Sequence, residues 1–274
     1  MKTIDTLIGD IYNVLDSGIE NPNEEYVQQF ATNLATILKD TVIGYSKERK
    51  GTLRMSNVGR PCKRQLWYES KGEKGEELDP KTKLKFMYGN IVEEVLLYLA
   101  KEAGHAVSHE QEEVEISGIV GHMDAVIDDV VIDVKSASSY AFKKFKENKL
   151  EDDDSFGYIP QLSGYAKALG KSQAAFLAMD KNTGELALTP IKQLADIEAI
   201  IDHTKSTVNS DVTPERGYPE VADGKSGNRK LHPICGYCAF KKSCYPDMRG
   251  FRYSNGIKYL TYVAKPPNVP EIDV

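Results

Sequence analysis

Apolar residues recur every three or four positions along much of the chain, which is the spacing of one face of an α-helix. Leu7, Ile11 and Leu15 show this spacing near the start. Gly or Pro residues stand near the ends of most such stretches. The charged residues 141–154 are expected to form a helix followed by a loop. The other helices are expected over residues 4–16, 24–39, 63–70, 83–103, 159–169 and 191–208.

Short runs of Val and Ile that alternate with polar residues are typical of β-strands. Glycine-bearing residues 51–61 and 71–80 are expected to be loops, and residues 211–234 are rich in turn formers. The mixture of helices and strands predicts an α/β protein. The strands are expected over residues 112–116, 119–127, 130–136, 174–179, 185–189 and 253–264.

Composition narrows the class of protein. Of 274 residues, 41% are hydrophobic and 28% are charged, which supplies a sizeable core and excludes wholesale disorder. The longest apolar runs, such as Val95–Ala100, are too short to span a bilayer. Residues 1–18 carry acids within their apolar pattern, unlike a signal peptide. We therefore expect a cytoplasmic protein without a membrane partner.

The net charge of −6 hides an uneven distribution. Tyr45–Arg64 and Lys225–Arg252 each hold seven Lys or Arg residues and a single acid, so the rest of the chain is strongly acidic. Nucleic acid stays among the candidate ligands, because phosphate binding requires clustered cations rather than a positive net charge.

All four cysteines lie in these two basic segments. Cys62 lies in the first, and Cys235, Cys238 and Cys244 form a C-x2-C-x5-C set in the second. Four cysteines in a chain without a signal peptide indicate metal binding rather than disulfides.

Acidic residues gather in a predicted hairpin. If Asp128 and Asp129 form its two-residue turn, Asp124 faces Asp133 on the neighbouring strand. Alternation then places Asp133 and Lys135 on one face and only apolar residues on the other. Carboxylates directly opposite each other are destabilising unless a cation compensates, and oxygen ligands suit Mg²⁺. An exposed hairpin face with a solvated Asp–Lys pair would show the same pattern.

Two helical pairs flank this hairpin. Gly89 and Glu93 share one helix face upstream, where Glu93 could reach the same cation, although Glu94 stands beside it. Gln161 and Tyr165 share a helix face downstream, where both could hydrogen-bond a phosphate or a water. A surface glutamate, a helix-boundary residue and a half-buried tyrosine are the ordinary alternatives.

These residues, in this order, resemble the motif set of the PD-(D/E)XK nuclease superfamily. The matching motifs are G-x3-E at Gly89–Glu93, D at Asp124, D-x-K at Asp133–Lys135 and Q-x3-Y at Gln161–Tyr165. Ser56–Tyr68 resembles the S-x5-C-x-R-x3-Y lead-in of the RecB-like branch. With the C-x2-C-x5-C set, the chain is similar to the iron–sulfur subgroup, which includes the AddB nuclease domain and CRISPR-associated and phage-encoded exonucleases. The resemblance covers about residues 53–246.

The resemblance implies a restriction-endonuclease-like core, in which helices flank a central mixed β-sheet. Its implied organisation is an N-terminal helical region over residues 1–50 and a nuclease domain over 51–264. In the C-terminal iron–sulfur segment of this domain, the cluster would be bound by residue 62 together with cysteines within residues 235–244. Residues 265–274 form a tail.

The implied chemistry is Mg²⁺- or Mn²⁺-dependent hydrolysis of DNA phosphodiesters. Glu93, Asp124 and Asp133 would be the metal ligands, although many RecB-like members have histidine at the position of Glu93. Lys135 would activate the attacking water or steady the phosphate. The implied catalytic set is Glu93, Asp124, Asp133, Lys135, Gln161 and Tyr165, of which the last two would also contact DNA.

The four cysteines would hold a structural [4Fe–4S] cluster, because such clusters take four thiolates and tolerate long sequence separations. Structural zinc is the second interpretation, and unligated buried cysteines are the third. A cluster would bring the two basic segments together into one DNA-binding surface. Its expected nucleic-acid contacts are Arg60, Lys63, Arg64, Lys241 and Lys242.

The function expected is a DNA exonuclease acting on single strands or DNA ends in recombination, repair or replication. A non-catalytic iron–sulfur DNA-binding scaffold and a structure-specific endonuclease are the alternatives. The Gly224-Lys225-Ser226 triplet lacks the upstream glycine of a phosphate loop, because that position is Pro219. Degradation coupled to unwinding would therefore require a helicase or recombination partner. The sequence predicts neither cleavage polarity nor oligomeric state.

Overall fold

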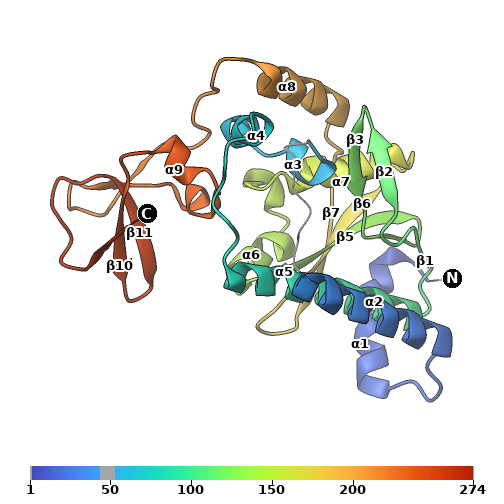
Figure 1. Ribbon diagram of the computed structural model, residues 1–274. Coiled ribbons are helices and arrows are strands. Elements are labelled where there is room, and N and C mark those ends of the chain that lie inside the picture. Colours follow the sequence, from blue (N-terminus) through green and yellow to red (C-terminus); the bar gives the residue numbers. More distant parts are fainter. Residues whose placement is uncertain (1, 44–52, 274) are drawn as a thin grey trace. The chain divides into compact units, whose positions relative to one another are not determined.

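The computed structural model describes residues 2–43 and 53–273 (Figure 1). The predicted domain limit at residue 50 lies outside the described residues, as do Lys47, Arg49 and Lys50 of the first basic segment. No helix in the described ranges is both long enough and apolar enough to cross a membrane.

The described chain forms two compact units, each assembled from separate stretches of sequence. The first comprises residues 2–43, Leu53–Gly59 and Asp79–Asp202, and the second comprises Arg60–Leu78 and residues 203–273. Each unit is described by itself below, and the domain limits expected from the sequence stay predictions.

The first unit is built on a five-stranded sheet with the strand order β1-β4-β5-β6-β7. Strands β5 and β6 run parallel, and the other neighbours are antiparallel. The unit is therefore an α/β structure with the expected central mixed sheet. The strands are β1 (Val107–Ser108), β4 (Ala125–Ile127), β5 (Val130–Ala137), β6 (Ala174–Asp180) and β7 (Leu186–Pro190).

Helices cover both faces of this sheet (Figure 1). Helices α1 and α5 pack on one face, α3, α6 and α7 pack toward the other, and α2 lies along α5. A separate hairpin of β2 and β3 contacts α7 and α3. These elements are α1 (Leu7–Ser17), α2 (Glu24–Ile43), α3 (Met55–Val58), α5 (Pro80–Glu102), α6 (Ser139–Lys146), α7 (Tyr158–Ala168), β2 (Glu113–Ile116) and β3 (Ile119–His122), with short 3-10 turns at Ile4–Thr6 and Leu150–Asp152.

Side chains alternate along β5 as predicted, and the sheet has an apolar layer on each face. Val130, Ile132 and Val134 pack against α1 and α5, whereas Val131 packs on the opposite side with Phe176. Burial of apolar side chains on both faces is the main stabilising contribution to such a sheet.

The hairpin register predicted from the sequence is confirmed. Ala125 pairs with Ile132 and Ile127 pairs with Val130. Asp128 and Asp129 both have positive φ angles, 49° and 71°, as a two-residue type I′ turn requires.

The single strand expected over residues 119–127 is wrong. The chain leaves β3 after His122 and enters β4 only at Ala125, so Asp124 lies just outside the ladder. Strand β3 pairs with β2, while β4 joins the main sheet. Period-2 alternation cannot show such a break, because both halves keep a strand pattern.

Helix α3 interrupts the loop expected over residues 51–61. The Asn57 carboxamide accepts a hydrogen bond from the Arg54 backbone N–H at 2.8 Å, which closes the turn. Met55 is fully buried against α7 and β3. A Cβ atom at Gly164 would lie 2.2 Å from the Met55 sulfur, and one at Gly121 would lie 2.5 Å from the Met55 Cβ. Both glycines are therefore required for this packing.

Two helix limits also differ from expectation. Helix α5 starts at Pro80 rather than residue 83, because the Asp79 carboxylate accepts hydrogen bonds from the backbone of Lys81 and Thr82, at 2.8 and 3.0 Å. Helix α8 covers only Ile197–Asn209, so residues 191–196 precede the helix expected to include them.

The second unit contains the two helices nearest the cysteines and a five-stranded sheet with the order β12-β10-β11-β9-β8. Its small core includes Leu231, Tyr245 and Met248. The strand expected over residues 253–264 is β11 within this sheet. The elements are α4 (Lys63–Ser70), a 3-10 turn (Pro233–Tyr237), α9 (Lys241–Cys244), β8 (Val221–Ala222), β9 (Arg229–Lys230), β10 (Arg249–Tyr253), β11 (Gly256–Tyr262) and β12 (Glu271–Ile272).

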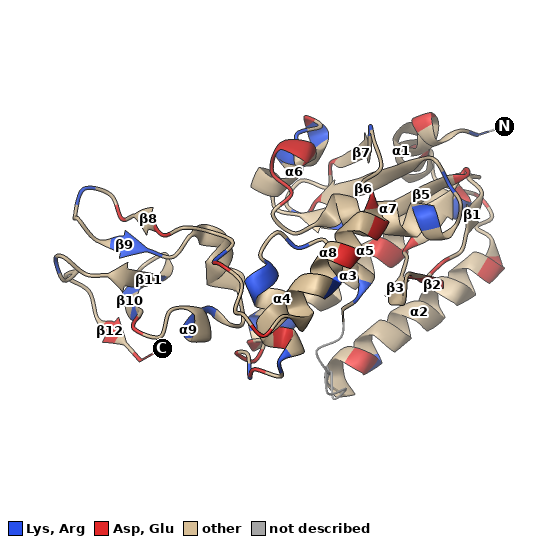
Figure 2. Ribbon diagram, turned by 90° about the horizontal axis from the view of Figure 1, so that it is seen from above, with Lys and Arg blue, Asp and Glu red and all other residues tan. Residues whose placement is uncertain are grey.

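Ion pairs reduce the positive charge of the second basic segment. Figure 2 shows Lys and Arg on β9 and β10 close to acidic residues of the same unit. Arg249 pairs with Glu271 at 2.6 Å, and Lys230 pairs with Asp223 at 3.4 Å. The count of basic residues in the sequence therefore overstates the cationic surface available to a phosphate backbone.

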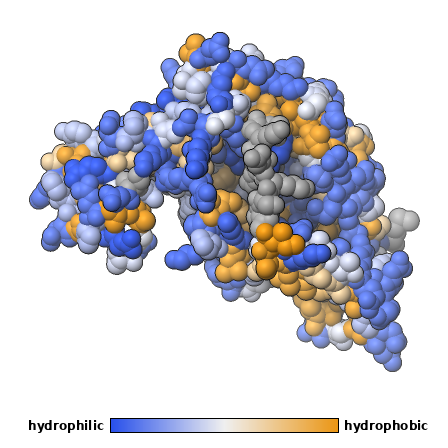
Figure 3. Space-filling model, viewed as in Figure 1, coloured by the Kyte–Doolittle hydropathy of each residue, from blue (hydrophilic) through white to orange (hydrophobic). Residues whose placement is uncertain are grey.

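Hydrophobic side chains are also exposed on α2 and α5. Val42, Leu84 and Phe86 have exposed fractions of 86, 60 and 45%. Figure 3 shows hydrophobic side chains among hydrophilic ones over this part of the first unit. Exposed apolar groups of this size are common singly on protein surfaces.

Candidate active site and cysteine pocket

Asp124, Asp133 and Lys135 converge where β4 begins beside β5. Because β4 starts at Ala125, Val134 has no strand partner on this side, and its N–H donates to Asp124 Oδ2 at 2.6 Å. Asp133 is 1% exposed, and its carboxylate forms an ion pair with the Lys135 ammonium. The Lys135 Nζ lies 4.7 Å from the centre of the Tyr158 ring. The predicted D…D-x-K set is therefore one spatial cluster.

Helix α7 brings Gln161 to this cluster. The Gln161 Nε2 donates to Asp133 Oδ1 at 3.4 Å and to the Tyr165 hydroxyl at 3.2 Å. Tyr165 is 1% exposed, packed beside Gly121. The predicted neighbourhood of both residues is present, but Tyr165 lies behind Gln161. Its hydroxyl accepts a hydrogen bond from the Gln161 amide, and its side chain is buried rather than at the surface.

The two adjacent glutamates of α5 face different neighbours. Glu94 is buried, and its Oε2 accepts a hydrogen bond from Asn33 Nδ2 of α2 at 2.9 Å. Glu93 instead faces Asp124 and Asp133, whose charges act on it. Glu93 is therefore the carboxylate that joins the cluster, as the sequence interpretation chose.

Gly89 has a smaller role than expected. A Cβ atom at Gly89 would meet only the Ser136 hydroxyl, at 3.6 Å, which is ordinary van der Waals contact. Helix α5 does pass close to β5 here, but the space would admit an alanine.

The cluster holds three carboxylates and one ammonium group in a poorly solvated place. Burial, and then repulsion from Asp124 and Asp133, raise the pKa of Glu93 to about 9. Burial and repulsion from Asp133 raise the pKa of Asp124 to about 7. Burial lowers the pKa of Lys135, but Asp133 and Asp124 outweigh it, so this pKa lies above its usual value and the ammonium stays charged.

This charge balance fits a divalent cation. Lys135 alone does not compensate three carboxylates, and oxygen ligands of this kind bind Mg²⁺ and Mn²⁺. As the side chains stand, no group of three or more His, Cys, Asp or Glu residues within 2–43 and 53–273 is arranged to hold a metal ion. The metal therefore stays a prediction, supported by the donor types and their mutual repulsion.

These pKa shifts predict how stability changes with pH. Above about pH 5 the unfolded chain has lost the protons of Glu93 and Asp124, whereas the folded, metal-free protein retains them. The melting temperature in EDTA is therefore expected to fall between about pH 5 and pH 9. Carboxylates with a lowered pKa, such as Asp79, change the stability only at more acidic pH, below about pH 5.

Adding Mn²⁺ at pH 8 is expected to restore the lost stability, because a bound cation offsets the repulsion. The measurement is thermal unfolding across this pH range with and without the cation. A melting temperature that rises toward pH 9, or that does not change when Mn²⁺ is added at pH 8, would contradict the proposed repulsion among the three carboxylates.

Gln111 is a site residue that the sequence did not indicate. Its side-chain amide donates to Glu93 Oε1, and its backbone N–H donates to the Asp124 carbonyl at 3.1 Å. Gln111 thus connects the Glu93 carboxylate of α5 to the backbone at Asp124. It lies in a turn where His109 and Gln111 both have positive φ angles, 56° and 53°, a conformation that no motif signals.

If the carboxylate cluster cleaves DNA as the sequence predicts, replacing Gln111 with alanine is expected to reduce the cleavage rate about tenfold without unfolding the protein. The reason is that Glu93 loses its positioning hydrogen bond while the exposed turn remains. The measurement is kcat against Mn²⁺ concentration, in which the variant should require more Mn²⁺. Glu112→Ala, next to it, removes a carboxylate that pairs with His109 and serves as the control. Unchanged metal dependence in Gln111→Ala would exclude this role.

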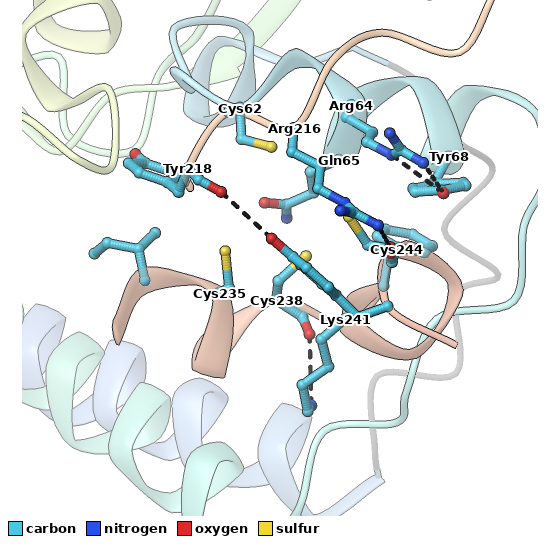
Figure 4. Close-up of a pocket in the computed structure, with 14 residues that line it drawn as sticks. Cys62, Arg64, Gln65, Tyr68, Arg216, Tyr218, Cys235, Cys238, Lys241 and Cys244 are labelled. Atoms are coloured by element: carbon cyan, nitrogen blue, oxygen red, sulfur yellow. Dashed lines mark hydrogen bonds between the residues drawn. The ribbon is translucent and has the colours of Figure 1, made fainter. Parts of the chain in front are cut away.

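The four cysteines line one pocket of the second unit (Figure 4). Cys62 precedes α4, Cys235 and Cys238 lie in the 3-10 turn and just after it, and Cys244 ends α9. None forms a disulfide. The two sequence segments that carry the cysteines do come together, as predicted.

The electrostatics of this pocket disfavour four free thiolates. Burial, and then the neighbouring cysteines, raise the pKa of Cys235 to about 12, and burial also raises the pKa of Cys238. A cationic centre would reverse this repulsion, because thiolates bind zinc and iron in their ionised form. The donor set therefore fits a thiolate-bound centre, although the arrangement of its sulfur atoms shows no metal site.

Neighbouring residues hold the cysteine segments in place. Arg64 donates to the Tyr68 hydroxyl, which donates to the Ser243 carbonyl at 3.2 Å. A Cβ atom at Gly217 would lie 2.8 Å from Cys62 Cβ and 3.0 Å from its sulfur, so only glycine fits there. The Arg and Tyr of the lead-in motif thus fasten α4 to the cysteine-bearing segment.

The predicted nucleic-acid contacts differ in their accessibility. Lys242 is exposed, and Arg60 and Lys63 are half-buried, with burial lowering the pKa of Lys63 to about 8. Arg64 is engaged with Tyr68 and with the Pro214 carbonyl. Lys241 is only 6% exposed and pairs with Glu76, so its predicted contact with DNA is contradicted. Its ammonium stabilises the cysteine segment instead.

Comparison with known proteins finds remote structural likeness. No protein-family model matches the chain, and no curated protein matches it in sequence. The crystal structure of SSO0001 superposes with a TM-score of 0.43 at 18% identity, covering 77% of this chain and 93% of that one.

Two further structures are described as exonucleases. The alkaline exonuclease LHK-Exo from Laribacter hongkongensis has a TM-score of 0.44 at 17% identity, covering 58% of this chain and 89% of its own. A phage-related exonuclease from Haemophilus somnus 129PT has a TM-score of 0.38 at 20% identity, covering 64% and 89%. All three TM-scores lie below 0.5, so these likenesses are remote.

Proposed function

We propose that this chain is a divalent-metal-dependent DNA exonuclease of the PD-(D/E)XK type. The observation that supports it most is the convergence of Glu93, Asp124 and Asp133 with the charged Lys135 at the open edge of β5. Carboxylates that repel one another in a poorly solvated place destabilise the fold, so their presence together indicates a functional site.

The side chains of the cluster would have separate roles in phosphodiester hydrolysis. Glu93, Asp124 and Asp133 would hold the cation, which when bound polarises the phosphate and lowers the pKa of a water molecule. Lys135, kept charged by Asp133, would donate to a phosphate oxygen as negative charge develops there. Gln161 would orient Asp133, and Tyr165 would keep the Gln161 amide in place.

The test is degradation of end-labelled DNA, single-stranded and duplex, with Mg²⁺ or Mn²⁺. Wild-type protein is expected to release labelled nucleotides, and Lys135→Ala is expected to lose activity by at least about a hundredfold. Lys171→Ala, which removes only a surface ion pair with Asp129, is the matched control. Full activity of Lys135→Ala would overturn the assignment.

Circular single-stranded DNA separates this proposal from a structure-specific endonuclease, because an end-dependent enzyme leaves circles intact. Tight, salt-sensitive DNA binding without cleavage under any divalent cation would instead identify a non-catalytic scaffold. Because the chain carries no complete phosphate loop, degradation coupled to duplex unwinding would require a separate helicase or recombination partner.

For the second unit we propose a structural [4Fe–4S] cluster held by Cys62, Cys235, Cys238 and Cys244, with zinc as the second candidate. The shared pocket and the mutual repulsion of the thiols support a bound centre. The spacing supports iron and sulfur over zinc, because one distant cysteine joins three close ones.

A further inference from the structure

A pocket of about 380 Å³ lies beside Glu93, between α2, α5 and the turn before β2. This volume falls within the range of small-molecule binding sites, roughly 300–1,000 Å³. Neutral polar side chains dominate the parts of its wall that the helices and the turn contribute. They are Gln29, Asn33, Thr36, Asn90 and Gln111.

The charges around the pocket exclude an anionic occupant. Glu93, Glu94 and Glu110 also line it, and there is no Lys or Arg among its described lining residues. Lys101 pairs with Glu110 at 2.7 Å and donates to the Gln29 amide oxygen at 2.8 Å, so its charge is already engaged. Carboxylates in a partly enclosed space repel a phosphate. Among the parts of a nucleotide, the neutral sugar and base therefore fit this pocket and the phosphate does not.

Glu93 belongs both to the catalytic cluster and to the wall of this pocket. Gln111 lines the pocket as well, and it donates to Glu93. Whatever fills the pocket thus lies next to a phosphate held at the cluster. In a nucleic acid, each phosphate is joined through a deoxyribose to a neutral base, and it is the base whose edge carries both hydrogen-bond donors and acceptors.

The lining also matches the chemistry of a base. A carboxamide presents a donor and an acceptor side by side, and the edges of nucleobases do the same. Asn90 is exposed on α5 and faces the pocket, while Thr36 faces it from α2. Both sides of the pocket can therefore hydrogen-bond one planar ligand.

We infer that this pocket binds the nucleobase of a nucleotide that flanks the scissile phosphate. The inference rests on the proposed nuclease function and adds a base-recognition site to it. Helix α2 of the predicted N-terminal region thereby acquires a role in substrate binding, because it supplies one wall of the pocket.

The experiment uses the full-length protein and single-stranded oligonucleotides in which one nucleotide flanking the first scissile phosphate lacks its base. The direction in which the wild-type protein degrades a single strand, 5′ to 3′ or 3′ to 5′, identifies that phosphate. Asn90→Ala is compared with Gln28→Ala, a control on α2 whose amide donates to Glu24 one turn away and does not line the pocket. The readout is kcat/KM on intact and on abasic DNA.

Asn90→Ala is expected to lower kcat/KM about fivefold on intact DNA and to have no effect on DNA lacking the base that occupies the pocket, because the lost hydrogen bond is to that base. Gln28→Ala should change neither value. An equal loss of kcat/KM on intact and abasic DNA would show that Asn90 has only a structural role. No loss on either substrate would show that no base binds in the pocket. Both results would overturn this inference while leaving the nuclease assignment intact. No cleavage by wild type would overturn both.

Discussion

Asp124→Asn is expected to abolish DNA cleavage and, in the absence of metal, to raise the melting temperature of the protein at pH 8. The first effect follows because the carboxylate that faces Asp133 would be lost as a cation ligand. A reduction of roughly 10²–10³-fold or more is expected, as for removal of a principal group that stabilises transition-state charge. The measurement is the initial rate on end-labelled DNA with Mn²⁺.

The second effect follows from the raised pKa of Asp124, about 7 in the folded protein. Stability is lost as the pH rises from the unfolded pKa, about 4, to the folded one, and asparagine avoids this loss. Asparagine Oδ1 can still accept the hydrogen bond from the Val134 N–H. We expect a gain of about 3 °C or more at pH 8, since 1 kcal/mol corresponds to roughly 2–4 °C in a chain of this size.

The pH dependence of the gain provides its control. The difference between Asp124→Asn and wild type should vanish below about pH 3, where the carboxyl is protonated in both states, and should reach its full size above about pH 8. Asp129→Asn, at the exposed hairpin turn, should show no such gain because its carboxylate pairs only with Lys171 at the surface. Retained activity in Asp124→Asn would remove this residue from the site.

Cys62→Ser is expected to remove the chromophore of the anaerobically purified protein and to unfold much of the second unit. Cys62 is the only cysteine outside residues 235–244, so its thiolate would join α4 to that segment through the bound centre. One apolar cluster of this unit is small, with Leu231, Tyr245 and Met248 as its buried residues and Cys235 and Cys244 packed against it, so a bound centre would supply much of the local stability. The measurements are the absorption band near 400 nm, metal content and limited proteolysis.

Gly217→Ala tests the same site without removing a thiol. The added methyl group would lie within 3.0 Å of Cys62 Cβ and sulfur, so Cys62 must move and the cluster should be lost or labile. Lys242→Ala, exposed beside Cys244, should keep the absorption band. A colourless wild-type protein with one zinc per chain would replace the iron–sulfur proposal by the zinc one. Wild-type folding and colour in Cys62→Ser would exclude both.

Much of the central hairpin could be predicted from the sequence. Two adjacent aspartates between runs of Val and Ile define a two-residue turn, and such a turn determines the register of its strands. Alternation then determines which side chains of β5 share a face, because successive Cβ atoms point to opposite sides of a sheet. Asp133 and Lys135 were placed correctly for this reason, as was the apolar face formed by Val130, Ile132 and Val134.

The convergence of the cysteines was also predictable in part. Thiols in a chain with this composition indicate a metal centre, and their spacing implies that distant segments meet. The pairing of basic residues with acids was not predictable, because ion pairs such as Lys258–Asp223 join strands whose neighbours are set by the fold. The DNA contact predicted for Lys241 failed for the same reason.

By itself, the sequence determined the α/β class, the hairpin register, and the shared face of Asp133 and Lys135. These properties depend on local periodicity and on turn geometry, which act over a few residues. Only the tertiary structure decided that Glu93 rather than Glu94 faces the cluster, that Tyr165 is buried behind Gln161, and that Gln111 holds Glu93. Those outcomes depend on how α5, α7 and the turn before β2 pack around β5. Contacts between elements distant in sequence produce no periodic pattern in the sequence from which they could be predicted.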